Sequence, residues 1–156
     1  MAEQTSAETK EGLIRELSEA VQETLAYFEG PGQTAKARIG DWGAWDVLAH
    51  FPYWHYATAW GIRSSAIGGP PWQLSGNADE INAACLAMLE GESFAALVAQ
   101  LREAQARLLR SAESAGNLDA VAFRMVDGRQ VTVGQRLETI ARHWRGHLQA
   151  LREAEA

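Results

Sequence analysis

Residues 131–152 read VTVGQRLETIARHWRGHLQALR, and this stretch decides the fold. A set of positions in it recurs at alternating steps of four and three residues, the spacing of a bundle helix that buries one face. At its start, Thr132 and Gln135 form the pattern of a capping box, in which two side chains bond free backbone N–H groups. We therefore predict a long helix from about residue 133. The recurring positions are Val133, Leu137, Ile140, Trp144, His147 and Leu151.

Three further segments show the same kind of helical periodicity. The first spans residues 6–29 and carries its apolar side chains on one stripe. The second spans residues 44–67 and is apolar nearly all round, which predicts a helix buried at the centre of the fold. The third spans residues 77–115. Gly91 interrupts it, and Ser93 is placed to cap a new helix start after that interruption.

The segment before the last helix is less regular. Residues 121–133 alternate in polarity around Asp127-Gly128, a pattern that fits either a short hairpin or a loop. Four long helices with one long connection predict an all-α fold, a four-helix bundle. The length of 156 residues fits a single domain over residues 1–156.

Composition narrows the functional class. The formal net charge of −6 leaves no broad positive field, so we expect no nucleic-acid partner. A single cysteine, Cys85, cannot form an internal disulfide, which suits a reducing cytosol. The first residues are acidic and lack an apolar run, and the longest uncharged stretch, residues 47–62, is too short and too polar to cross a membrane. We therefore expect a cytoplasmic protein without a membrane partner.

The four histidines fall into two pairs and carry the main functional signal. His143 and His147 lie four residues apart on one helix face, where two imidazoles can bind one metal ion at ~2.0–2.1 Å. A third ligand is needed from another helix, and His50 on the buried helix is the leading candidate. His55 points about 140° away from His50, at roughly 100° per residue, and is a poorer choice. Trp144 stands where the HExxH motif has its glutamate, which disfavours a metalloprotease.

Each of these assignments has a structural alternative. A histidine on an apolar face is often a core residue bonded to a backbone carbonyl. Asp46 could orient the His50 ring, or it could complement the dipole at the start of its helix. Trp54 could line a pocket or simply fill the core. The residues that we expect in the pocket or behind the ligands are Asp46, Trp54, His55 and Trp144.

Two arginines flank the histidine motif of the last helix. Arg142 and Arg145 could bind an anionic substrate through bidentate hydrogen bonds. The alternative is that they form a solvated face, because this chain uses arginine in preference to lysine throughout. Both readings stay open at this point.

Two motifs resemble the DinB/YfiT-like superfamily. Residues 40–50, GDWGAWDVLAH, resemble the start of the second helix of that family, which ends in its first metal-binding histidine. Residues 131–152 resemble its last helix, with the pattern V-T-x-G-x-x-L-x-x-I-x-x-H-x-x-x-H followed by L-R. Order and spacing agree over most of the chain, whereas residues 67–129 match only as helix and loop.

The resemblance implies a four-helix bundle with up-down-down-up connectivity. It also implies that His50, His143 and His147 hold a divalent metal ion, zinc or nickel being favoured. Family members use thiols such as mycothiol, bacillithiol or glutathione, or act as hydrolases. The implied function is a metal-dependent hydrolase or thiol S-transferase that acts on a small electrophilic molecule. Its nucleophile would be a water molecule or a thiol activated by the metal, with no side chain assigned as catalytic.

A different class of function stays open beside this one. The same cleft would serve a non-catalytic small-molecule-binding protein in self-resistance or the stress response. A homodimer is compatible with the outer helix faces, which are rich in alanine and leucine.

Overall fold

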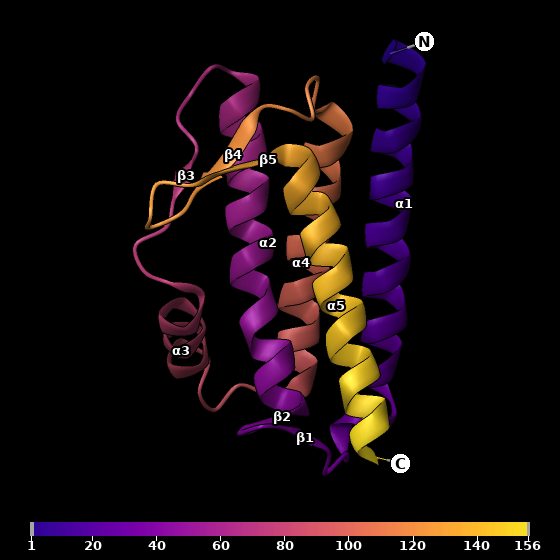
Figure 1. Ribbon diagram of the computed structural model, residues 1–156. Coiled ribbons are helices and arrows are strands. Elements are labelled where there is room, and N and C mark those ends of the chain that lie inside the picture. Colours follow the sequence, from indigo (N-terminus) through magenta and orange to yellow (C-terminus); the bar gives the residue numbers. More distant parts are fainter. Residues whose placement is uncertain (1, 156) are drawn as a thin grey trace.

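Four long helices lie side by side in the computed structural model, which describes the backbone of residues 2–155 and the side chains of residues 9–155 (Figure 1). A fifth, shorter helix lies outside them next to the second one. The helices are α1 (Ala2–Glu29), α2 (Ala44–Ala66), α3 (Ala78–Met88), α4 (Phe94–Ser114) and α5 (Val133–Glu155). Short strands accompany them: β1 (Arg38–Ile39), β2 (Trp42–Gly43), β3 (Trp72–Gln73), β4 (Val121–Arg124) and β5 (Gln130–Thr132). A 3-10 turn, Pro31–Gln33, follows α1.

The long helices pack as two pairs. α1 packs on α5 and α2 packs on α4, and further contacts of α1 with α4 and of α2 with α5 close the bundle. In the view of Figure 1, α1 and α5 run downwards, whereas α2 and α4 run upwards. The expected all-α bundle therefore describes the structure in outline, with small sheets added at both ends. Within residues 2–155, none of the helices combines the length and hydropathy that crossing a bilayer requires.

The helix starts follow the signals in the sequence. The Thr132 N–H donates to Gln135 Oε1 at 2.9 Å, and the Gln135 N–H donates to Thr132 Oγ1 at 3.2 Å, so the predicted capping box is confirmed. The predicted break in the third helical segment is also confirmed. Ser93 Oγ accepts the N–H of Ala96 at 3.1 Å and caps α4. Gly91, with φ of +89°, makes the turn that separates α3 from α4.

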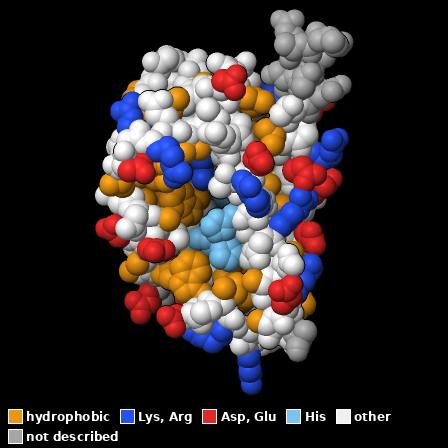
Figure 2. Space-filling model, in the orientation of Figure 1, with side chains coloured by type: hydrophobic (Ala, Val, Ile, Leu, Met, Phe, Trp, Pro, Cys, Tyr) orange, Lys and Arg blue, Asp and Glu red, His pale blue; other side chains and the backbone are white. Residues whose placement is uncertain are grey.

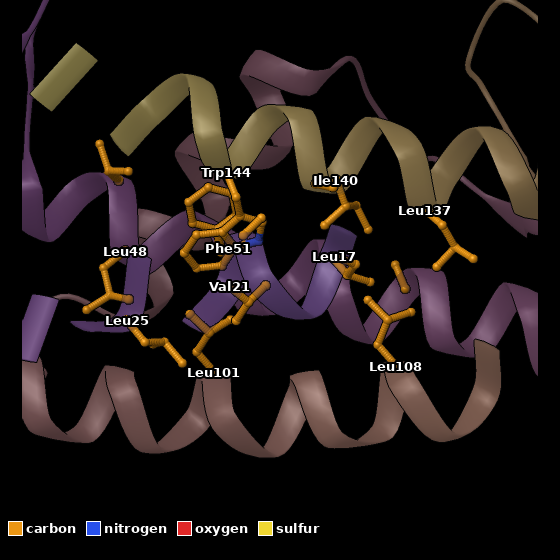
Figure 3. Packing of buried hydrophobic residues seen from close by; sticks show 14 of the residues in the cluster. Leu17, Val21, Leu25, Leu48, Phe51, Leu101, Leu108, Leu137, Ile140 and Trp144 are labelled. Carbon is orange, nitrogen blue, oxygen red and sulfur yellow. The ribbon is translucent and has the colours of Figure 1, made fainter. Parts of the chain in front are cut away.

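The core lies between the four long helices, and each contributes side chains without solvent exposure. Leu17 of α1, Leu48 of α2, Leu101 of α4 and Leu137 of α5 are all 0% exposed. Figure 3 shows these helices converging around the pair formed by the rings of Phe51 and Trp144. As predicted, α2 is the most enclosed helix, with buried side chains on every side.

The strands form two small sheets. β4 and β5 pair antiparallel as a hairpin, which settles the choice between a hairpin and a loop. β3 joins that hairpin in parallel, with Trp72 opposite Phe123, and β1 pairs with β2 just before α2. Strands of two residues show no detectable alternation, so the sequence did not predict β1, β2 or β3. Gly61 of α2 lies so close to β4 that a Cβ there would collide with the backbone carbonyl of Ala122.

We predict that Gly61→Ala lowers the free energy of unfolding, because the added methyl group forces α2 away from β4. Overpacking of this kind typically costs about 1–3 kcal/mol. Urea denaturation followed by circular dichroism measures the change. The matched control is Gly146→Ala, a helical glycine whose Cβ would meet no atom within 4 Å. That variant should gain up to about 1 kcal/mol from helix propensity. Equal destabilisation of both variants would contradict the packing argument.

Candidate metal centre

Three imidazole rings from two helices meet at one point of the bundle. His50 comes from α2, and His143 and His147 come from α5; one ring nitrogen of each lies within 4.8 Å of the other two. The Nε2 atoms of His50 and His143 are 3.5 Å apart, and those of His143 and His147 are 2.7 Å apart. Two nitrogens that bind one ion at ~2.0–2.1 Å lie about 3 Å from each other, so these separations suit a shared ion.

The ring of His50 is held in a fixed orientation. It is 0% exposed, and its Nδ1–H donates to the backbone carbonyl of Val47 in the preceding turn. The rings of Phe51 and Trp42 lie against it, with centroids 4.2 and 4.8 Å away. Because Nδ1 carries the hydrogen in this bond, the lone pair of Nε2 is free and faces His143.

The local environment favours the neutral form of all three rings. Burial, followed by repulsion from the other two rings, lowers the pKa of His50 to about 3. Burial and repulsion from His143 lower the pKa of His147 to about 4. Burial also lowers the pKa of His143, and the charge of Arg136 lowers it further. Neutral imidazoles are the protonation state in which histidine donates to a metal.

Of the two roles considered for Asp46, the structure shows the one at the start of its helix. Its carboxylate accepts the N–H of Gly43 at 2.8 Å and thereby caps the start of α2. The other alternative, that its carboxylate orients His50, is not what the structure shows, because the carbonyl of Val47 accepts the hydrogen of that ring. Trp54 lines a cavity beside the histidines, and its Nε1–H donates to Asn82 Oδ1 at 2.8 Å.

His55 and Trp144 both lie in the core and neither lines the pocket, which corrects the expectation for His55, whereas Trp144 lies behind a residue of the pocket. Both side chains are 0% exposed, and the two rings meet edge to face with centroids 5.7 Å apart. Five residues after His50, the ring of His55 points to a different side of α2. Trp144 stacks on Phe51 at 3.4 Å and 9°, so it supports a residue of the pocket from behind.

The two arginines that flank the histidine motif face away from the centre. Arg145 forms an ion pair with Glu16 and approaches Glu19 at 3.8 Å, which ties α5 to α1. Arg142 is exposed and lines a surface depression between the same two helices. Neither lines the cavity beside the histidines, because neighbours in sequence point to different sides of a helix. The expectation that they bind substrate is therefore corrected.

The cavity next to His50 and His143 has a volume of about 190 Å³. Figure 2 shows histidine side chains in a hollow on this face, bordered by hydrophobic side chains and with basic ones nearby. Sequence reasoning missed Arg136, although it precedes His143 by seven residues, or two helical turns, on the same face. It also missed the contributions of α3 and β4, which no local pattern indicates. The lining residues are His50, Phe51, Trp54, Ala78, Asn82, Phe123, Met125, Arg136, Thr139, Ile140 and His143.

Solved structures with a similar fold come from an enzyme. Two crystal structures of mycothiol-dependent maleylpyruvate isomerase, one with a histidine replaced by alanine, align with TM-scores of 0.73. Sequence identities are 18% and 16%, and the alignments cover 92% of this chain and 60% of theirs. The chain thus spans about 60% of the length of these proteins, and the likeness shows that it shares their fold over that part. No protein-family model and no curated protein matches the sequence.

His55 should make the stability of the fold depend on pH. Burial lowers its pKa from 6.5 to about 4, and the nearby Phe51 carbonyl and Gln105 side chain oppose this shift without forming a hydrogen bond of normal geometry to either ring nitrogen. The unfolded chain binds a proton here below pH 6.5, whereas the folded chain does not until about pH 4. The contribution of His55 to stability should therefore fall by about 2 kcal/mol between pH 7 and pH 5.

The test compares wild type with His55→Leu by urea denaturation at pH 7 and pH 5. Leucine has a similar size and removes two unbonded nitrogens, so we expect equal or greater stability at pH 7. The decrease in the free energy of unfolding from pH 7 to pH 5 should be smaller in His55→Leu than in wild type, by about 2 kcal/mol. An unchanged pH dependence would show that His55 does not titrate as its burial implies.

Proposed function

We propose that this chain binds a divalent metal ion, zinc or nickel, through His50, His143 and His147. We further propose that it acts as a thiol-dependent enzyme of the S-transferase type on a small electrophilic molecule. The observation that carries the proposal is the convergence of three neutral imidazole nitrogens from two helices beside a cavity of about 190 Å³. A set of three histidines leaves coordination positions open, which is typical of catalytic rather than structural sites.

The donor set suits the proposed ions. Imidazole nitrogens bind zinc and nickel readily, and the lowered pKa values of His50 and His147 keep their lone pairs available at neutral pH. A divalent ion in this position would supply Lewis-acid activation and lower the pKa of a thiol or of water.

The side chains of this protein have a positioning role. The Val47 carbonyl holds the His50 ring, and the stacked rings of Phe51 and Trp144 set its distance from α5. Phe51, Trp54 and other apolar lining residues exclude bulk water from one side of the site. No aspartate or glutamate of the described residues lines the cavity, so we assign no side chain as general base.

The preference for a thiol over water rests on the structural neighbours. Both are structures of a mycothiol-dependent enzyme with a similar fold. The cavity of this chain is lined by residues of α2 and α5 of that bundle. Hydrolysis by an activated water remains the alternative chemistry, and a binding protein without turnover remains the alternative class. Experiments on metal content and on turnover separate these cases.

The first prediction from the proposed function concerns metal content. Wild-type protein, purified without an affinity tag, loaded with zinc and desalted, should retain close to one ion per chain. His50→Ala, His143→Ala and His147→Ala should each lose it, because two imidazoles hold a labile ion poorly. Elemental mass spectrometry measures the ratio. The matched control is His55→Leu, a buried histidine outside the site, which should retain the metal. Wild type without metal would overturn the metalloenzyme proposal.

The second prediction concerns turnover. The zinc- or nickel-loaded protein should accelerate coupling of 1-chloro-2,4-dinitrobenzene to a low-molecular-weight thiol, measured by product absorbance with glutathione, mycothiol or bacillithiol. His143→Ala should fall to the uncatalysed rate. Turnover of ester or amide substrates without any thiol would favour the hydrolase instead. Binding of an electrophile or its product without turnover by any loaded form would favour the non-catalytic class.

A further inference from the structure

Arg136 of α5 extends into the same cavity as the histidines. Its guanidinium lies over the ring of Phe123, with 4.3 Å from Cζ to the ring centroid, and 5.6 Å from the ring of Trp54. Its Nε and Nη2 donate to Thr58 Oγ1 at 3.3 and 3.2 Å. Thr58 is 0% exposed, so the guanidinium is held between aromatic faces by a buried anchor.

Among the side chains that the structure describes, this arginine has no negatively charged partner. No carboxylate of the described side chains lies within ion-pair distance of it, and its Nη1 makes no hydrogen bond to the described protein. Burial lowers the pKa of Arg136 to about 10, so it still carries its charge at neutral pH. Other arginines form ion pairs with glutamates at the surface: Arg102, Arg107, Arg145 and Arg152.

The charge balance of the cavity points to an anionic ligand. The described lining residues include one guanidinium, two histidines and no carboxylate, so the cavity holds a positive charge and no negative one. An unpaired charge in an apolar cavity is costly, and a guanidinium with free N–H groups is suited to a planar, bidentate acceptor. The amide nitrogen of Asn82, whose oxygen is taken by Trp54, is a second donor at the cavity wall.

The volume sets the size of the part of the ligand that the cavity can enclose. A cavity of ~150 Å³ accommodates benzene, so about 190 Å³ accepts a ring-sized body with one small substituent. Tripeptide-sized molecules need several hundred Å³. The lining by Phe51, Trp54 and Phe123 favours a flat apolar body.

We infer that Arg136 is the anion-binding residue of this cavity and that the substrate is a small, flat molecule carrying a carboxylate. The carboxylate accepts hydrogen bonds from Arg136, and the apolar body lies between Arg136 and the histidines. That the bound molecule is a substrate rests on the proposed function. That its carboxylate binds to Arg136 does not, because this binding needs no metal. It assigns to Arg136 the role that the flanking positions Arg142 and Arg145 do not fill.

The test measures binding of benzoate and of its neutral analogue benzamide to the full chain. Quenching of tryptophan fluorescence reports binding, because Trp54 lines the cavity, and calorimetry checks the affinities. Both forms of the protein are titrated, as purified and after zinc loading. We expect wild type to prefer benzoate over benzamide by roughly tenfold or more, since hydrogen bonds to charged groups contribute that much.

The variants assign the preference to one residue. Arg136→Gln should abolish the preference for benzoate while benzamide binding changes little, and Arg136→Lys should retain part of it. The matched control is Arg142→Gln, an exposed arginine of the same helix outside the cavity, which should behave as wild type. If Arg136→Gln fails to fold, the wild-type ratio and Arg136→Lys still decide. Equal affinity of wild type for benzoate and benzamide would overturn the inference.

Two further outcomes separate this inference from its neighbours. Glutathione should not displace benzoate. Displacement would mean that Arg136 binds a carboxylate of the thiol and not of the substrate, which would overturn the inference. Zinc content is measured on the same samples. Retained zinc without a preference for benzoate overturns the inference and leaves the proposed function intact. A preference for benzoate without bound zinc supports the inference and overturns the proposed metal site.

Discussion

The stacking of Phe51 on Trp144 is the contact on which the rest of the site depends. Phe51 follows His50 directly on α2, and Trp144 follows His143 directly on α5. Their ring centroids lie 3.4 Å apart at 9°, so the two helices are fixed to each other one residue from a histidine on each side. A shift of one helix along the other would break this stack and would also move the imidazole nitrogens apart. The position of the candidate ligands is therefore a result of core packing.

Much of the fold could be predicted because its long helices carry strong local signals. Periodicity placed the four long helices, and the side chains of Thr132, Gln135 and Ser93 placed two of their starts. The spacing of His143 and His147 put them on one face, and His50 on the most apolar helix faces them in the structure. The two-residue strands, and the packing of α3 outside the four long helices, depend on tertiary contacts, so no local pattern could indicate them.

Three of the corrected predictions share one physical cause. Arg142, Arg145 and His55 are close to the histidines in sequence, but a step of about 100° per residue turns each of them to another side of its helix. Arg136 is distant in sequence, yet two full turns return it to the side of His143. Phase around the helix, rather than distance along the chain, determines which residues share the cavity.

Part of the cavity wall comes from α3 and the hairpin, which lie outside the four long helices. α3 packs mainly on α2, and it supplies Ala78 and Asn82 to the lining, while the hairpin supplies Phe123 and Met125. The histidines stand instead on α2 and α5, whose register the core fixes. Substitutions in α3 or the hairpin can therefore reshape what the cavity accepts without disturbing the three rings. A fold arranged in this way can acquire new ligand preferences by changing its outer pieces one at a time.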